Sequence, residues 1–239
     1  MQNQNKDALS RTELLLGEAA MQKLADAHVI IFGIGGVGGY ALEALVRSGV
    51  GKITAVDADT VSVSNINRQI IATAKTVGKL KVDAARERAS EINPDIEFTA
   101  IPIFYSDENA SDINLEDYNY VIDAIDTVKS KISLIVNATK KNVPIISSMG
   151  AGNKLDPTLF KVSDIYKTSV CPLARVMRTE LKKQGIKKLK CVYSEEPPIK
   201  AIASDGNAPK TRHAPGSIAT IPSVVGLILA SEVINDLTK

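Results

Sequence analysis

One short stretch decides the fold of this chain: Gly33-Ile34-Gly35-Gly36-Val37-Gly38. The apolar run before it, residues 28–32, is typical of a β-strand, and apolar residues recur at helical spacing after it. A glycine turn between a strand and a helix leaves backbone N–H groups at the positive end of the helix free to face a phosphate. The four glycines are therefore candidate nucleotide-binding residues: Gly33, Gly35, Gly36 and Gly38.

The segments that follow predict the fold class. A second strand ends at Asp57 and Asp59, about 20 residues beyond the last glycine, where an acidic side chain usually binds the ribose of a nucleotide. Short β-branched runs then alternate with helical segments such as Lys79 to Asn93. This pattern predicts an α/β fold with a doubly wound, mostly parallel, Rossmann-like sheet, and a nucleotide site at the carboxyl edge of its strands. The strands are expected to begin near His28, Lys52, Ile96, Tyr120 and Val143.

Residues after the second strand indicate the chemistry, because glycines and acids alone suit a dehydrogenase and an ATP-dependent enzyme equally. Asn65 and Arg68 project to one side of a helical turn, and Lys81 opens the next helix. A fixed guanidinium and amide stabilise charge on a phosphate under attack, which hydride transfer does not need. Asp126, at the end of another apolar strand, offers a carboxylate for Mg²⁺. Taken singly, Arg68 and Lys81 are better explained as solvated surface charges and Asp126 as a cap on the following helix, but together they favour ATP chemistry.

Five motifs resemble those of the E1-like (ubiquitin-activating-like, ThiF-like) family of adenylating enzymes. In chain order they are Gly33-x-Gly35-Gly36-x-Gly38, Asp57-x-Asp59, Ser64-Asn65-x-Asn67-Arg68-Gln69, Gly78-x-x-Lys81 and Asp126. The resemblance implies that ATP is the nucleotide and that the residues of these motifs form its site.

The resemblance also implies a role for each residue. Asp59 would bind ribose, and Asn65, Arg68 and Lys81 would hold phosphates. Asp126 would coordinate Mg²⁺. Arg11 resembles the N-terminal arginine that reaches across a homodimer to the partner's ATP. The implied catalytic residues are Arg11, Arg68, Lys81 and Asp126, and the implied nucleotide-binding residues include Asp57 and Gln69.

Later motifs extend the resemblance, almost end to end, to a branch of this family that acts on a modified adenosine of tRNA. They include Gly150-Ala151-Gly152, Asp156-Pro157-Thr158, Cys191-Val192-Tyr193-Ser194-Glu195 and Gly216-Ser217-Ile218. The branch implies ATP-dependent cyclisation of N6-threonylcarbamoyladenosine: its carboxylate is adenylated, and the urea-like nitrogen then closes the ring and expels AMP. The rival interpretations are activation of the C-terminus of a sulfur-carrier or ubiquitin-like protein, a non-catalytic nucleotide-binding module, and a redox enzyme.

The cysteines help to separate these alternatives. Relatives that activate sulfur carriers commonly hold zinc with two Cys-x-x-Cys pairs, and ubiquitin-type activators need a nucleophilic cysteine. This chain has only Cys171 and Cys191, with no such pair, and two histidines. A Cys₄ zinc site is therefore excluded, and no zinc is expected. Cys171 is either an activated thiol near basic residues or an ordinary helix-start residue, and the sequence supplies no specific base for the first.

The basic residues are unevenly distributed, although the net charge is only +2. Between Lys167 and Lys190, eight basic residues accompany the single acid Glu180. This basic run is either a solvated helix face or a contact for the phosphates of tRNA. We expect one domain over residues 1–239, with an ATP-binding core in 11–150 and substrate recognition in 151–239.

The ends of the chain indicate the compartment. The first ten residues are polar and carry no signal-peptide pattern, so a cytoplasmic protein is expected. The homodimer is what the resemblance at Arg11 implies. Residues 214–231 contain no charge, but their prolines and glycines favour a loop and then a buried helix from about Ser223 to Asp236 over a membrane anchor. The sequence leaves open a sulfur-relay protein partner, a monovalent cation site and the identity of the tRNAs.

Overall fold

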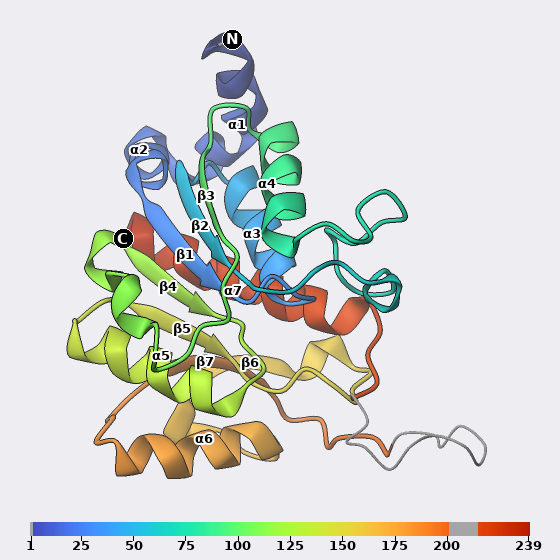
Figure 1. The fold of residues 1–239 in the computed structure, drawn as a ribbon. Helices are drawn as coiled ribbons and strands as arrows, with labels where there is room; N and C mark the ends of the chain where they lie inside the picture. The colour runs from blue at the N-terminus through green and yellow to red at the C-terminus, as the bar shows by residue number, and fades with distance from the viewer. Residues whose placement is uncertain (1, 201–214) are drawn as a thin grey trace.

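The protein folds around a seven-stranded sheet in the order β3-β2-β1-β4-β5-β7-β6 (Figure 1). The computed structural model describes the backbone of residues 2–200 and 215–239, and side chains from residue 7 onward within those ranges. Neighbouring strands are parallel except for β6 and β7. The predicted doubly wound, mostly parallel α/β sheet is therefore confirmed. The strands are β1 (His28–Phe32), β2 (Lys52–Val56), β3 (Glu97–Ile101), β4 (Tyr120–Asp123), β5 (Ile145–Ser148), β6 (Phe160–Asp164) and β7 (Lys190–Ser194).

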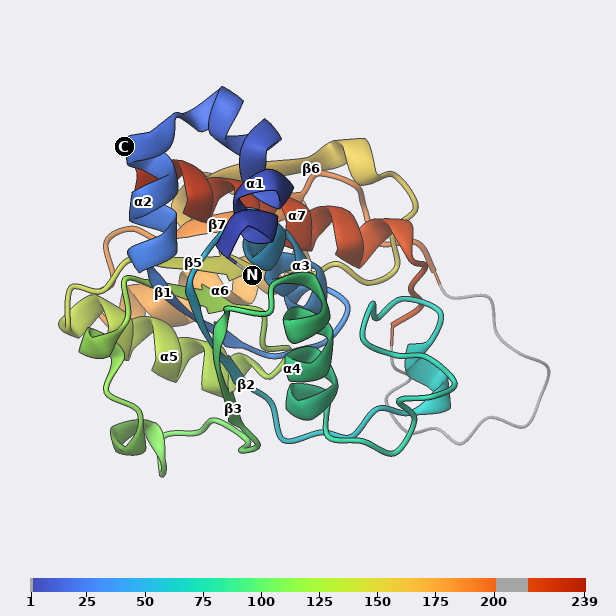
Figure 2. The same ribbon diagram turned by 90° about the horizontal axis from the view of Figure 1, so that it is seen from above.

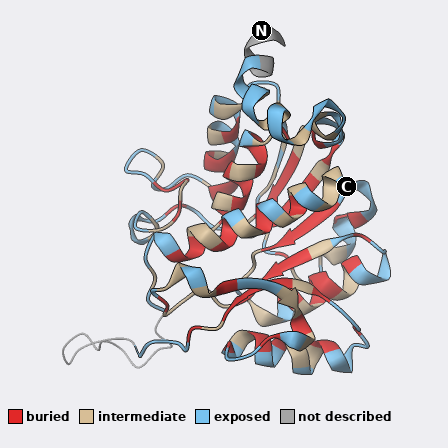
Figure 3. Ribbon diagram, turned by 180° about the vertical axis from the view of Figure 1, so that it is seen from behind, coloured by how far each residue is buried: buried red, intermediate tan, exposed pale blue. Residues whose placement is uncertain are grey.

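Helices cover both faces of the sheet. They are α1 (Gln2–Leu16), α2 (Glu18–Asp26), α3 (Gly38–Arg47), α4 (Lys81–Ile92), α5 (Val128–Lys140), α6 (Pro172–Lys183) and α7 (Thr220–Thr238). In β1, Val29 and Ile31 pack in a core with α3, α4 and α7, whereas Ile30 and Phe32 pack with α5. The central parallel strands are buried on both faces, as their red colour in Figure 3 shows. Polar and apolar residues therefore do not alternate along them.

The element bounds differ slightly from those expected. β3 begins at Glu97 and β5 at Ile145, one and two residues later than predicted. α4 begins at Lys81 rather than Lys79 because the carbonyl of Lys79 accepts the N–H of Val61 at 2.8 Å, outside the helix. β6 and β7 carry no pattern from which a strand was predicted. β6 is an edge strand with exposed residues, so it lacks the apolar run by which β1, β2, β4 and β5 were found.

α7 is the helix predicted for the uncharged C-terminal segment, with one side buried, and it extends beyond the expected residues at both ends. By length and composition alone it could cross a membrane. In the structure it packs against α3 and buries Ile221, Val225 and Leu229. The approach is so close at Gly226 that an added Cβ would lie 2.3 Å from the carbonyl oxygen of Val37. This packing favours a core helix; Ala214, at the start of the uncharged segment, lies outside the described residues.

Candidate nucleotide-binding site

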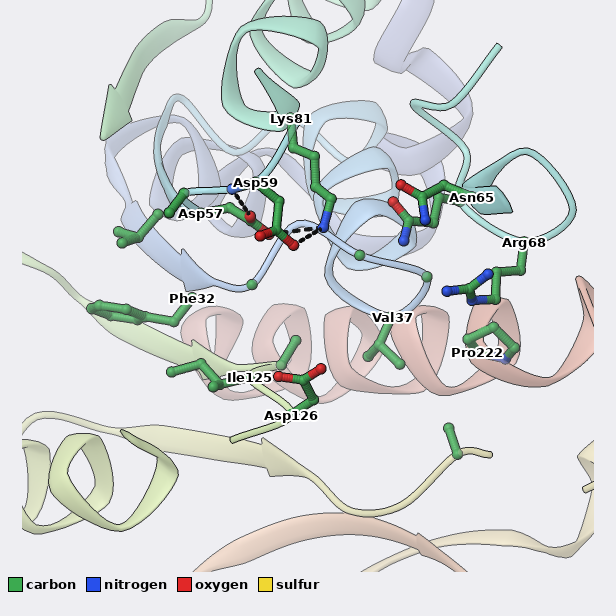
Figure 4. Close-up of a pocket in the computed structure, with 18 of the residues that line it drawn as sticks. Phe32, Val37, Asp57, Asp59, Asn65, Arg68, Lys81, Ile125, Asp126 and Pro222 are labelled. Carbon is green, nitrogen blue, oxygen red and sulfur yellow. Dashed lines mark hydrogen bonds and ion pairs between the residues drawn. The ribbon is translucent and has the colours of Figure 1, made fainter. Parts of the chain in front are cut away.

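A cavity of about 520 Å³ opens at the carboxyl edge of β1, β2 and β4 (Figure 4). Small-molecule sites typically measure about 300–1,000 Å³. Arg11 and Gly38 do not line this cavity. Every other predicted site residue does: Gly33, Gly35, Gly36, Asp57, Asp59, Asn65, Arg68, Gln69, Lys81 and Asp126.

The glycines shape the loop beneath the cavity. Gly33 has a φ of +89°, and an added Cβ would lie 2.6 Å from the carbonyl oxygen of Ala124. At Gly38 an added Cβ would lie 1.8 Å from the carbonyl oxygen of Gly33, so this glycine allows α3 to begin close under the loop. Val37 precedes α3 and makes no side-chain cap. No side-chain cap closes the start of α3, although the N–H of Gly39 donates to the carbonyl of Gly35 at 3.0 Å. The positive end of the helix dipole at this start suits an anion.

Asp57 and Asp59 have different surroundings. Asp57 accepts the N–H of Ile34 at 2.7 Å and that of Asp59 at 2.8 Å, so it fastens the glycine loop to the end of β2. Burial raises the pKa of Asp57, and the Lys81 ammonium and these two N–H donors oppose the rise. The Asp59 side chain is 70% exposed, and its carboxylate lies 2.6 Å from Lys81 Nζ. Of the two acids, Asp59 therefore presents the more accessible carboxylate to a ligand.

Asn65, Arg68 and Gln69 come from one turn, because the N–H groups of Arg68 and Gln69 both donate to the carbonyl of Asn65. The guanidinium of Arg68 points into the cavity (Figure 4) and donates to the carbonyl of Ser64 at 2.9 Å. Gln69 is only 6% exposed, and its Oε1 has no hydrogen-bond partner among the described residues. Because buried polar atoms are normally hydrogen-bonded, this amide suits a ligand in the cavity.

Asp126 lies three residues beyond the end of β4, not at the strand end as predicted. It is exposed to the cavity, and Thr127 rather than Asp126 stands at the N-cap of α5. Within the described residues no group of three or more His, Cys, Asp or Glu could hold a metal. An ion here would thus have one carboxylate and take its other ligands from phosphates and water. That donor set fits Mg²⁺, which commonly binds proteins together with nucleotide phosphates.

Two groups of residues at the site were not predicted from the sequence. Ile103, Phe104 and Tyr105, just after β3, supply apolar lining that no motif marked. Asp123 and Lys131 form an ion pair behind the cavity, and both side chains are 0% exposed. Asp123 could have been recognised as a candidate from the sequence, because it ends an apolar strand. Lys131 could not, because it resembles any lysine of an amphipathic helix.

Arg11 lies on α1, away from the cavity of its own chain. α1 packs beside the turn between α3 and β2, where an added Cβ on Gly49 would lie 3.0 Å from Leu9 Cδ1. This turn is at the amino edge of the sheet, and Figures 1 and 2 show α1 extending from it. Leu14 and Leu15, which follow Arg11 on α1, are 88% and 84% exposed.

The basic run lies partly at the opposite edge of the sheet from the cavity. Lys188 and Lys190 line a second cavity of about 660 Å³ with Tyr120 and Ile145, the first residues of β4 and β5. Lys190 also pairs with Glu232 at 3.1 Å and with Asp236 at 2.6 Å. Acids of α7 therefore neutralise a charge that the local sequence leaves unbalanced.

Neither cysteine is accessible to a substrate. Cys171 stands at the N-cap of α6, as the helix-start alternative requires, and is 1% exposed. Cys191 lies in β7 with no exposed surface, and burial raises its pKa to about 12. A thiol must ionise and be accessible to act as a nucleophile. The geometry therefore disfavours a thioester route.

Comparisons with known proteins agree with this geometry. The sequence profile of the ThiF family matches residues 9–239. The tRNA threonylcarbamoyladenosine dehydratase of Bacillus subtilis is 44% identical over 239 residues, covering 96% of this chain and 94% of that protein. The adenylyltransferase and sulfurtransferase UBA4 of Kluyveromyces lactis is 32% identical over 157 residues, 66% of this chain and 34% of that protein.

Solved structures show the same relationship. Crystal structures of the E. coli tRNA N6-threonylcarbamoyladenosine dehydratase, TcdA, in complex with AMP and with ATP match with TM-scores of 0.88 and 0.85. Their sequence identities are 36% and 34%, and each match covers 97% of this chain and 94% of the TcdA chain. The chain therefore belongs to the ThiF family, in the branch that contains the tRNA threonylcarbamoyladenosine dehydratases.

Proposed function

We propose that this protein catalyses the ATP-dependent cyclisation of N6-threonylcarbamoyladenosine in tRNA, through an adenylated carboxylate. The observation that carries the proposal is one cavity in which Arg68, Lys81 and Asp126 surround a glycine-rich loop. These groups suit attack on a nucleotide phosphate, and the end-to-end similarity to tRNA threonylcarbamoyladenosine dehydratases supports this substrate.

In the first step, a carboxylate oxygen of the modified base attacks the α-phosphorus of ATP, and the bond to the β-phosphate breaks to release pyrophosphate. Arg68, Asn65 and the N–H groups of the glycine loop would stabilise the charge that grows on the phosphate oxygens. Lys81 is held by Asp59, so the pair would contact ribose and phosphate together. Asp126 would hold Mg²⁺, which supplies positive charge to the phosphates when bound.

In the second step, the urea-like nitrogen attacks the activated carbonyl carbon, loses its proton and expels AMP. Splitting one difficult dehydration into two displacements lowers each barrier. The net change is loss of water from the modified base, with ATP converted to AMP and pyrophosphate.

The two parts of the chain would divide the work, with residues 11–150 binding ATP and residues 151–239 recognising tRNA. Gly152, Pro215 and Ser217 line the same cavity as the ATP-binding motifs. Asn67 Nδ2 donates to the carbonyl of Ser217 at 2.9 Å, which joins the two parts at the rim. A modified base entering past this rim would meet the α-phosphate of ATP.

We also propose that the active form is a homodimer in which Arg11 completes the partner's site. Arg11 is exposed and distant from its own cavity, and a second copy would bury the exposed Leu14 and Leu15. Because the proposed substrate is tRNA, we expect the enzyme to act in the cytoplasm.

The proposal is tested by ATP–pyrophosphate exchange with purified protein. We expect exchange with tRNA that carries the modification, and none with unmodified tRNA or with small sulfur-carrier proteins. Mass spectrometry of the digested tRNA should show loss of one water from the modified nucleoside. Exchange driven by a carrier protein, without modified tRNA, would replace this proposal with the carrier-activating alternative.

A further inference from the structure

The buried ion pair between Asp123 and Lys131 joins the end of β4 to α5. Lys131 Nζ lies 2.9 Å from Asp123 Oδ2, and neither side chain has exposed surface. Ser147 Oγ, in β5, donates to the same carboxylate oxygen at 2.6 Å. Fully buried lysine and aspartate are rare unless they are paired, so this arrangement calls for an explanation.

The pair holds the loop that carries Asp126. Asp123 Oδ1 accepts the N–H of Ile125 at 3.2 Å, and Lys131 Nζ donates to the carbonyl of Ile125 at 3.1 Å. On the other side, Ala124 donates its N–H to the carbonyl of Phe32 at 2.9 Å. The loop is thus held between the buried pair and the start of the glycine loop, with Asp126 facing the cavity (Figure 4).

Stability alone does not account for this pair. Removing two charges from water is so unfavourable that hydrophobic residues of similar volume often serve a core equally well. Such residues could neither donate to the Ile125 carbonyl nor accept its N–H. The feature specific to the charged pair is therefore the position of the backbone next to Asp126.

We infer that Asp123 and Lys131 are positioning residues for Asp126, and that they set the geometry in which its carboxylate receives Mg²⁺ with ATP. The inference rests on the proposed function only for the role of Asp126. Residues that orient a metal ligand typically change metal affinity or activity by about 10–100-fold when they are substituted.

The test measures how strongly Mg²⁺ improves the binding of α,β-methylene-ATP, by calorimetry with Mg²⁺ and with EDTA. The variant Asp123→Asn/Lys131→Met removes both charges and approximately preserves volume, so the fold should persist. We expect the gain in affinity from Mg²⁺ to fall by roughly 10-fold, while affinity in EDTA changes little. If this variant unfolds, Asp123→Glu displaces the carboxylate but keeps the charge, and the same loss is expected.

A second comparison asks whether the pair acts through Asp126. Asp126→Asn should reduce the gain in affinity from Mg²⁺ to the part that phosphates and water alone supply, and adding the Asp123/Lys131 substitutions should then cause no further loss, because effects through one group are not additive. A further loss of equal size in the Asp126→Asn background would overturn the inference.

The matched control is Glu43→Gln/Arg88→Met, which removes a part-buried pair between α3 and α4 outside the cavity lining. It should lower the Tm but keep the gain from Mg²⁺. An equal loss in the control would show general loosening and would contradict the inference. The binding assay uses no tRNA, so it does not depend on the proposed substrate. If the proposed function is wrong, the wild-type protein will still bind the analogue but will not convert modified tRNA.

Discussion

Both edges of the sheet carry cationic side chains, but those at one edge are held by hydrogen bonds and ion pairs and those at the other are exposed to solvent. At the carboxyl edge, the Lys81 side chain is 8% exposed and paired with Asp59, and Arg68 is hydrogen-bonded to its own turn. At the amino edge, Lys182, Lys187 and Lys188 are exposed to solvent. The first set is held in place before any ligand arrives, whereas the second is not.

Strand direction explains the difference. Loops after parallel strands converge at the carboxyl edge, where the following helices begin and favour anions. Helices end at the amino edge, and Lys182 and Lys183 stand in the last turn of α6, where cations are favourable. Fixed cations suit a transition state whose charge develops at one place, whereas exposed cations suit a diffuse polyanion. We therefore propose that ATP chemistry takes place at the carboxyl edge and that the amino edge supplies any long-range attraction of tRNA.

The largest expected effect is at the carboxyl edge. Arg68→Ala and Asp126→Ala should each lower turnover by roughly 10²–10³-fold, because each removes a contact arranged in advance for the transition state. Turnover is measured as cyclised nucleoside formed per enzyme, and the Tm serves as the control for folding. Near-normal turnover in either folded variant would mean that the site residues are wrongly assigned.

The second prediction asks whether the site at the carboxyl edge of one subunit needs Arg11 from a second subunit for activity. Arg11→Ala and Asp126→Ala proteins should each be inactive, and mixing them should restore about a quarter of the sites, since half of the dimers are mixed and one site in each is intact. The measurement is turnover after subunit exchange has been verified by mass. No recovery despite exchange would indicate that each chain completes its own site.

The third prediction concerns the exposed lysines. Replacing Lys182, Lys183, Lys187 and Lys188 with Gln should weaken tRNA binding and make the log–log salt dependence shallower by roughly 0.7–0.9 per lost phosphate contact. Affinity for α,β-methylene-ATP should not change, because none of these residues lines the ATP cavity. An unchanged salt slope would leave these lysines as solvated charges at a helix end.

The smallest expected effect is a pH dependence in β7, between the two edges. Burial raises the pKa of Cys191 from 9.0 to about 12, so the folded state keeps a proton that the unfolded state loses. The free energy of unfolding should therefore fall as the pH rises above 9, by at most about 1.4 kcal/mol per unit from this thiol. Urea unfolding from pH 8 to 11 should show a shallower fall for Cys191→Ala. If the free energies of unfolding of the two proteins fell equally with pH, the raised pKa of Cys191 would be contradicted.

Site residues with a local signal could be found from the sequence. Asn65 and Arg68 were found because a three-residue spacing places them on one side of a turn, and both line the cavity. The Asp123–Lys131 pair was missed because it depends on how α5 packs against β4, which no spacing encodes. The contact between Asn67 and Ser217 joins residues far apart in the chain and is invisible in either motif.

The sequence by itself determined the fold class and the segments that carry the chemistry. These features are properties of short stretches: apolar runs, the spacing of charged residues, and a glycine at position 33, where the positive φ favours that residue type. Only the tertiary structure decided that Asp57 fastens a loop while Asp59 presents its carboxylate, and that Lys190 is neutralised by α7. The physical reason is that burial, pKa and pairing depend on which distant residues share a volume, and packing alone brings them together.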